Sequence, residues 1–255
     1  PIFRKVWIIE KGQWCCRAFF CCRNGSETEK STGDGTSFFF KPYGKGKGTG
    51  VVIMTYDYEN DTPCIDLKPI TKEEFINYLK KHDDWFLSEA MKQHHFLDEI
   101  YDKTVNTIRF ITLKDPKTHQ FKVFFAVQRI GTKETIPVDN GSRGGLVAKI
   151  DLETGILSEA RCLHNRNVYK VHPDSGAPIE GVQVPNWQEM KADMLELANK
   201  LPYMHFIAWD ILITEEGHCI IEANTSSGVN IIQLWGGQRH KELGDFYRYH
   251  GVIKK

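Results

Sequence analysis

The last third of the chain carries acidic and amide side chains at a spacing that can bind a metal ion. Asp210 lies inside an apolar run, and Glu222 and Asn224 end a second run that follows a Glu-Glu-Gly turn. Side chains two residues apart on a strand share a face, and a hairpin places its strands side by side. We therefore expect the three side chains to converge. Two carboxylates and a carboxamide suit Mg²⁺ shared with substrate phosphates, whereas the alternative is a hairpin with solvated acids.

A glycine-rich segment in the first quarter of the chain has the composition of a phosphate-binding loop. A Phe-rich run ends at Lys41, and the segment KPYGKGKGTG then leads into the apolar residues VVIM. Glycine lets backbone N–H groups approach an anion, and a lysine at a strand end reaches a phosphate as a point charge. The standard phosphate loops open a helix, whereas a strand is expected here, so the glycines predict a hairpin flap. The alternative is a basic turn without a ligand.

The bulk composition excludes several classes of protein. The 255 residues allow one large domain or two small lobes, and 41% apolar with 26% charged residues is typical of a soluble globule. The formal net charge is zero, which gives no basic excess for nucleic acid or an anionic membrane. No apolar run is long enough for a transmembrane helix, and the first residues, PIFRK, do not have the apolar core expected of a signal peptide.

The seven cysteines include the pattern CC-x4-CC, with aromatic residues around it. Vicinal pairs are a poor zinc pattern, so this segment is expected to be a buried strand. The cysteine usage predicts a reducing compartment, and we expect a cytoplasmic protein.

Strands and helices are expected to alternate along the chain. The expected strands lie within residues 1–23, 37–54, 84–91, 104–113, 121–130, 147–151 and the hairpin around Asp210. The expected helices cover residues 71–83, capped by Thr71, and 187–200. Residues 161–185 are expected to be irregular, and the chain is expected to end in a polar tail. This order predicts an α+β fold.

Together, these segments resemble the ATP-grasp superfamily, and most closely its sugar-transfer-associated, carboxylate–amine ligase-like branch. The resemblance rests on FKPYGKGKGTG, VNTIRF, VDNGSRGG, HPDSGAPIEG, VPNW and WDILITEEGHCIIEAN. It implies two α+β lobes with the nucleotide between them. Proteins of this superfamily usually carry a further α/β segment before the lid lobe, and because fewer than 40 residues precede Phe38, we expect this pre-ATP segment to be short or absent here. Residues 1–91 would form the lid lobe with its flap, and residues 92–255 the lobe with the metal site.

The resemblance also implies which residues contact ATP. Lys41 would contact the α- and β-phosphates, and the glycine flap would close over the β- and γ-phosphates. Backbone groups of the linking strand would meet adenine, and a histidine after it would reach the ribose, although a polar patch that binds nothing is the alternative for the histidine. The implied nucleotide-binding residues are Lys41, Gly44, Gly46, Gly48, Glu89, Ala90, Met91 and His94.

The implied catalytic residues are Lys41, Arg109 and Arg129, and the implied metal ligands are Asp210, Glu222 and Asn224 for Mg²⁺ or Mn²⁺. The two arginines would face the γ-phosphate or an anionic substrate, and the alternative for Arg129 is a simple ion pair with a carboxylate.

The implied activity is ATP- and Mg²⁺-dependent carboxylate–amine ligation through an acylphosphate. The substrates would be small molecules, with a sugar acid or amino acid of surface polysaccharide biosynthesis as the carboxylate. One alternative is a phosphotransferase acting on a hydroxyl, which would need a general base such as Asp139 or Asp151. The other is a protein that binds ATP without turnover.

Overall fold

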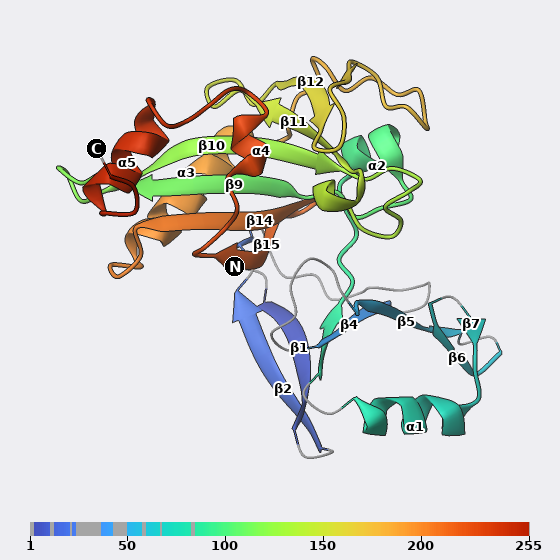
Figure 1. Ribbon diagram of the computed structural model, residues 1–255. Coiled ribbons are helices and arrows are strands. Elements are labelled where there is room, and N and C mark those ends of the chain that lie inside the picture. The colour runs from blue at the N-terminus through green and yellow to red at the C-terminus, as the bar shows by residue number, and fades with distance from the viewer. Residues whose placement is uncertain are drawn as a thin grey trace. The chain divides into compact units, whose positions relative to one another are not determined.

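The computed structural model describes residues 3–10, 13–20, 22–23, 37–42, 50–57, 60–66, 68–82 and 85–254, with the backbone alone for those before residue 37 and for Glu89. The chain divides into two compact units, Pro1–Lys92 and Gln93–Lys255, called unit 1 and unit 2 below. Each unit combines helices with an antiparallel sheet, so the fold class is α+β (Figure 1).

The sheet of unit 1 has the strand order β2-β1-β8-β4-β5-β6-β7. A short strand β3 (Cys22–Arg23) follows β2 in the chain, and one helix, α1 (Lys72–Lys81), lies between β7 and β8 in sequence. The strands of this sheet are β1 (Phe3–Glu10), β2 (Gln13–Phe20), β4 (Phe38–Pro42), β5 (Val52–Asp57), β6 (Thr62–Ile65), β7 (Lys68–Pro69) and β8 (Trp85–Glu89). The cysteine pairs of the CC-x4-CC segment were predicted to be buried, but their side chains are not among those that the structure describes.

The helix α1 covers one face of this sheet. Thr71 caps it in a full capping box, because its hydroxyl accepts the Glu74 N–H and the Glu74 carboxylate accepts the Thr71 N–H. The apolar residues of α1 pack against the fully buried Phe40 of β4. The predicted helix and its cap are therefore confirmed.

The sheet of unit 2 runs in the order β13-β12-β11-β10-β9-β14-β15. These strands are β9 (Ile108–Lys114), β10 (Phe121–Ile130), β11 (Leu146–Ile150), β12 (Leu157–Cys162), β13 (Val168–Tyr169), β14 (Phe206–Thr214) and β15 (Gly217–Asn224). The helices are α2 (His95–Tyr101), α3 (Trp187–Asn199), α4 (Asn230–Gln233) and α5 (Glu242–Tyr249), with a 3-10 turn η1 (Gly141–Arg143). No helix in the described part of the chain has the length and apolar character needed to cross a membrane.

The two faces of this sheet are covered by different helices (Figure 1). On one face, α2 and α3 pack on the larger core, which includes Phe110 of β9. On the other face, α4 and α5 contribute Ile232 and Phe246 to a smaller core with Ile111 and Val127. We call the second face the α5 face. Its smaller apolar core leaves room on the same strands for charged side chains.

Several elements of unit 2 differ from the sequence expectation, among them α2, β12, β13, α4 and α5. Strand β12 enters the segment that was expected to be irregular, because its small and apolar residues Leu157, Ala160 and Cys162 are buried on the sheet. The chain also ends in a helix, α5, where a polar tail was expected. Its buried residues Leu243 and Phe246 lie three apart, which is the spacing of a one-sided helix.

A buried polar network fixes the ends of β9 and β10. The Asn106 carboxamide oxygen accepts hydrogen bonds from the Thr104 hydroxyl (2.7 Å) and the Gly131 N–H (2.9 Å). The Asn106 side chain is fully buried, and its NH₂ group donates to the Tyr101 carbonyl at 2.8 Å. Because these bonds join the entry of β9 to the exit of β10, they set where both strands place their side chains.

We predict that Gly131→Ala destabilises unit 2 by roughly 1–3 kcal/mol. A Cβ at residue 131 would stand 2.3 Å from Oγ1 and 2.6 Å from Cβ of Thr104, so the buried Thr104 would have to move. Gly237→Ala is the matched control, since a Cβ there meets nothing within 4 Å. Urea unfolding of both variants measures the difference, and equal midpoints would contradict the prediction.

Buried histidine makes the stability of the protein depend on pH. His218 of β15 is 6% exposed, and burial lowers its pKa, only partly offset by Asp193 and Glu189. Burial also lowers the pKa values of His94 and His250. Below a pH of about 6.5 the unfolded chain therefore binds protons that the folded chain does not.

We predict that the free energy of unfolding falls as the pH is lowered from about 7.5 to about 5.5, and that His218→Gln flattens this slope by up to about 1.4 kcal/mol per pH unit. The slope should flatten without vanishing, because His94 and His250 act in the same direction. The exposed His240 provides the control, His240→Gln. Urea unfolding at several pH values tests this, and an unchanged slope in His218→Gln would refute it.

Candidate active site on the sheet of unit 2

A row of charged residues crosses the sheet of unit 2 on the α5 face. In the strand register, Asp210 pairs with Glu222 on one side and with Arg109 on the other. Arg109 pairs with Val127, which pairs with Lys149. Residues directly opposite on antiparallel strands point to the same face, so these side chains line one surface. The hairpin thus brings together the residues for which a convergent site was predicted.

Asp210 is the centre of this row. Its side chain is 10% exposed, and its carboxylate accepts a forked pair of hydrogen bonds from Arg109, with Nε–Oδ1 at 2.5 Å and Nη2–Oδ2 at 3.1 Å. The remaining amino group of Arg109 donates to the hydroxyl of Ser227, which lies in the loop after β15. Forked arginine–carboxylate pairs are both stronger and more directional than single contacts, so Arg109 is held in one orientation.

Arg129 links Asp210 to a second buried carboxylate. Its Nη1 donates to Oδ2 of Asp210 at 3.1 Å, and its Nη2 donates to Oδ1 of Asp139. Burial opposes the charged form of Arg129, but the Asp139 and Asp210 carboxylates outweigh it and raise its pKa. The sequence left open that Arg129 simply forms an ion pair with a carboxylate. That ion pair is present, and it lies within the same cluster as the predicted site.

Asp139 is a structural carboxylate in this arrangement. It is 3% exposed, and its Oδ2 accepts hydrogen bonds from the Thr107 N–H at 2.7 Å and the Thr107 hydroxyl at 2.6 Å. Because its other oxygen faces Arg129, Asp139 holds the arginine and the start of β9 together. Asp151, the other candidate base, accepts N–H groups of Glu153 and Thr154 within a turn.

The metal-binding prediction is compatible with the donor set on β14 and β15. Glu222 lies opposite Asp210, and Asn224, two residues further along β15, shares its face. Glu222 is exposed and Asn224 is half-buried, and neither side chain forms a hydrogen bond or ion pair with another described residue. Two carboxylates and a carboxamide oxygen are hard ligands of the kind that Mg²⁺ and Mn²⁺ take.

Three further residues of this surface were not predicted. Ser227 holds Arg109, and the exposed Lys149 places its Nζ 5.9 Å from the centre of the Phe125 ring. Arg161 of β12 lies against the Trp235 ring at 5.3 Å and donates to the Leu234 carbonyl at 2.6 Å. The period-two alternation of VAKI predicts that Lys149 shares a face with Val147, which is the signal that could have found it.

The site residues predicted in unit 1 lie on and after adjacent strands. Lys41 of β4 pairs with Phe86 of β8, and its Nζ lies 5.3 Å from the centre of the Phe39 ring. Phe40 packs on α1, so the alternation of the strand places Lys41 on the other face of the sheet. The N–H of Ala90, just after β8, donates to the Ser37 carbonyl at 2.8 Å.

Less is described of the other site residues predicted in unit 1. Met91 follows Ala90 and is half-buried, and Glu89 ends β8. Gly44, Gly46 and Gly48 lie outside the described residues, so the flap stays a prediction.

His94, predicted to reach the ribose, caps α2. Its Nδ1 accepts the Phe96 N–H at 3.2 Å, and its Nε2 lies 3.5 Å from Oε2 of Glu215. The other oxygen of Glu215 accepts the His95 N–H at 2.7 Å and contacts the His95 ring at 2.9 Å. His94, His95 and Glu215 offer ligand atoms within 4.8 Å of one another, but these bonds explain the cluster as a helix cap.

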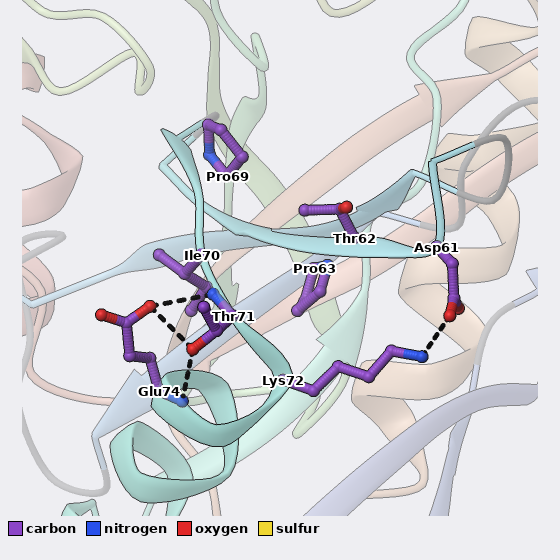
Figure 2. Close-up of a pocket in the computed structure, with 8 residues that line it drawn as sticks. All are labelled: Asp61, Thr62, Pro63, Pro69, Ile70, Thr71, Lys72 and Glu74. Carbon is purple, nitrogen blue, oxygen red and sulfur yellow. Dashed lines mark hydrogen bonds and ion pairs between the residues drawn. The ribbon is translucent and has the colours of Figure 1, made fainter.

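A hollow of about 350 Å³ lies in unit 1 beside the start of α1, and Figure 2 shows the residues that line it. None of the predicted site residues lines it. Its polar groups pair with one another, since Thr71 bonds Glu74 and Lys72 forms an ion pair with Asp61. The first pair belongs to the cap of α1 and the second joins α1 to the residue before β6, so we assign the hollow no ligand.

Comparisons with known proteins identify the family. The family model described as sugar-transfer associated ATP-grasp matches residues 19–243, whereas a search of curated proteins gives no match. Among solved structures, the chain is similar to the ATP-grasp ligase PsnB complexed with minimal precursor, at 14% identity and a TM-score of 0.37. That match covers 77% of this chain and 42% of the PsnB chain. Because the family model spans most of its length, the chain belongs to the sugar-transfer associated ATP-grasp family and has the ATP-grasp fold.

Proposed function

We propose that the protein is an ATP-dependent carboxylate–amine ligase that forms an amide through an acylphosphate. The observation that supports this most is the charged row Glu222–Asp210–Arg109, with Arg129 beside it, on one face of a sheet. It combines oxygen donors for a cation with guanidinium donors for an anion. Both are needed where a phosphoryl group is transferred between two negatively charged partners.

In the proposed reaction, an oxygen of the substrate carboxylate attacks the γ-phosphorus, and the bond to the β–γ bridging oxygen breaks. ADP leaves, and the carboxylate becomes an acylphosphate. The nitrogen of an amine then attacks the acyl carbon, phosphate departs with the bonding electrons, and the amine loses a proton. This sequence needs no protein nucleophile, so positioning and charge neutralisation carry the catalysis.

Different residues of the chain would bind the anions, the metal ion and the phosphates. Arg109 and Arg129 would bind the γ-phosphate and the incoming carboxylate, because guanidinium forks match both anions. Asp210, Glu222 and Asn224 would hold Mg²⁺ or Mn²⁺, which neutralises phosphate charge when bound. Lys41 would contact the α- and β-phosphates.

The remaining residues would bind the nucleoside. Backbone groups from Glu89 to Met91 would meet adenine, and His94 would lie near the ribose. The glycines of the flap, Gly44, Gly46 and Gly48, would contribute backbone N–H groups to the phosphates.

We propose a sugar acid or an amino acid as the carboxylate and a role in surface polysaccharide biosynthesis in the cytoplasm, and the description of the family as sugar-transfer associated supports the link to sugar chemistry. Transfer of phosphate to a hydroxyl is less well supported, because it needs a base. Asp139 is buried with both oxygens engaged, and Asp151 caps a turn. A ligase needs neither residue as a base at the phosphoryl-transfer step.

Product analysis tests the proposal. The protein is incubated with ATP, Mg²⁺ and pooled amino acids and uronic acids, and ADP, phosphate and new masses are followed together. We expect ADP and phosphate in equal amounts, with a product lighter by one water than its two precursors. If ADP appears with a phosphorylated acceptor and no free phosphate, the protein is a kinase and the ligase proposal is wrong. ATP binding without ADP in any mixture would favour the non-catalytic alternative.

A further inference from the structure

Arginine side chains use most of the hydrogen-bond acceptor sites of Asp210. Its Oδ1 accepts one hydrogen bond from Arg109, and its Oδ2 accepts one from Arg109 and one from Arg129. A carboxylate has about four acceptor sites, so three of them are used. A metal ion that takes Asp210 as a ligand must therefore displace at least part of this arginine pairing.

The charge of the cluster also opposes a lone cation. Arg109 and Arg129 balance Asp139 and Asp210, and all four side chains are at most 16% exposed. The exposed Glu222 adds one negative charge at the edge. A divalent ion placed against Asp210 would stand beside two mostly buried guanidinium groups, and repulsion between like charges is weakly screened there.

The two arginines are not equally free to move. Arg129 is tied to Asp139, which is itself fixed by two hydrogen bonds from Thr107. Among the described residues, the one other side-chain hydrogen bond of Arg109 goes to the neutral hydroxyl of Ser227. If Arg109 turns from Asp210 to a bound anion, it exchanges one carboxylate for another anion and leaves no charge unpaired. The same movement by Arg129 would leave Asp139 unpaired, which is costly in a buried site.

We propose that Arg109 is a positioning residue that blocks Asp210 as a metal ligand until an anion binds and draws the guanidinium away. Metal and phosphate binding are then coupled through Arg109, and the coupling acts equally in both directions. The inference rests on the proposed metal role of Asp210 and adds a role for Arg109 before any reaction begins.

The test is the affinity of the protein for Mn²⁺ alone, measured from the electron paramagnetic resonance signal of free Mn²⁺ without nucleotide. Arg109→Gln should bind Mn²⁺ more tightly than the unmodified protein, on the order of tenfold. The double variant Arg109→Gln/Asp210→Asn should lose that gain, because the gain comes from Asp210. Arg166→Gln, at an exposed arginine, is the control and should change nothing. Arg109→Lys keeps the charge but loses the fork, so it should give a smaller gain and provides a second variant if the glutamine variant fails to fold.

Unchanged Mn²⁺ affinity in folded Arg109→Gln and Arg109→Lys would overturn the proposal. A separate titration with Mn²⁺ and ATP distinguishes this failure from a failure of the proposed function. If Asp210→Asn weakens Mn²⁺ binding in the presence of ATP while the Arg109 variants change nothing, only the blocking role of Arg109 is wrong. If Asp210→Asn has no effect with ATP present, Asp210 is not a metal ligand and both proposals lose their basis.

Discussion

Asp210→Asn is expected to lower ATP turnover by at least about 10³-fold. The substitution keeps the shape of the side chain but removes the negative charge opposite Arg109 and Glu222. It also replaces an oxygen that accepts from arginine by an NH₂ group, which cannot accept. The site would lose a metal ligand and the group that orients Arg109. ADP release at saturating ATP and Mg²⁺ measures the loss, and turnover within about tenfold of the unmodified protein would contradict the metal assignment.

The control for this prediction must separate chemistry from folding. Arg109 and Arg129 both lose a charged partner in Asp210→Asn, so a loss of stability accompanies the loss of turnover. Turnover is therefore compared well below the unfolding temperature of the variant, which circular dichroism gives. Asp245→Asn, at an exposed helical ion pair with Arg248, is expected to leave turnover unchanged.

Asp139→Ala is expected to reduce the free energy of unfolding by about 3–5 kcal/mol. The Asp139 side chain is 4% exposed and holds both the Arg129 guanidinium and the Thr107 N–H and hydroxyl. Its removal leaves a buried charge with one partner fewer and a buried N–H without an acceptor, and each costs free energy. The matched change Asp245→Ala removes an exposed pair and should cost at most about 1 kcal/mol. Urea unfolding compares the two.

The same residue separates the ligase from the kinase alternative. If Asp139 holds Arg129, Asp139→Asn should lower stability and turnover together, because Arg129 then loses an anionic partner. If Asp139 were instead the general base for a hydroxyl acceptor, Asp139→Asn would remove turnover and leave the urea midpoint unchanged. That second pattern would contradict the structural role given to Asp139 here.

Local patterns in the sequence predicted the elements that position the site. The Glu-Glu-Gly turn and the two apolar runs around it predicted the hairpin that places Asp210 opposite Glu222. The capping box at Thr71 and the helical spacing behind it predicted α1. The predictions of the hairpin and of α1 are correct because caps, turns and side-chain periodicity act over a few residues.

The features of the site that the sequence did not predict depend on contacts between residues far apart in the chain. Arg109 and Asp210 are separated by 101 positions, and no local pattern shows that their side chains form a fork. Asp139 lies in a glycine-rich loop and was considered as a general base, but its ion pair with Arg129 makes it a buried structural carboxylate. His94 was predicted to reach the ribose, with a polar patch as the alternative, and no local pattern showed that the apolar residues after it form α2 and make it a helix cap. Each outcome is decided by packing in three dimensions.

The most direct test of carboxylate activation is the transfer of oxygen from the substrate to phosphate. The protein is incubated with ATP, Mg²⁺ and the pooled amino acids and uronic acids, whose carboxylates are labelled with ¹⁸O, and the released phosphate is analysed by mass spectrometry. Attack of the carboxylate on the γ-phosphorus followed by amide formation leaves one substrate oxygen in each phosphate, so we expect singly labelled phosphate together with ADP. Unlabelled phosphate formed alongside the amide product would mean that no acylphosphate is made, and the proposed reaction would be wrong.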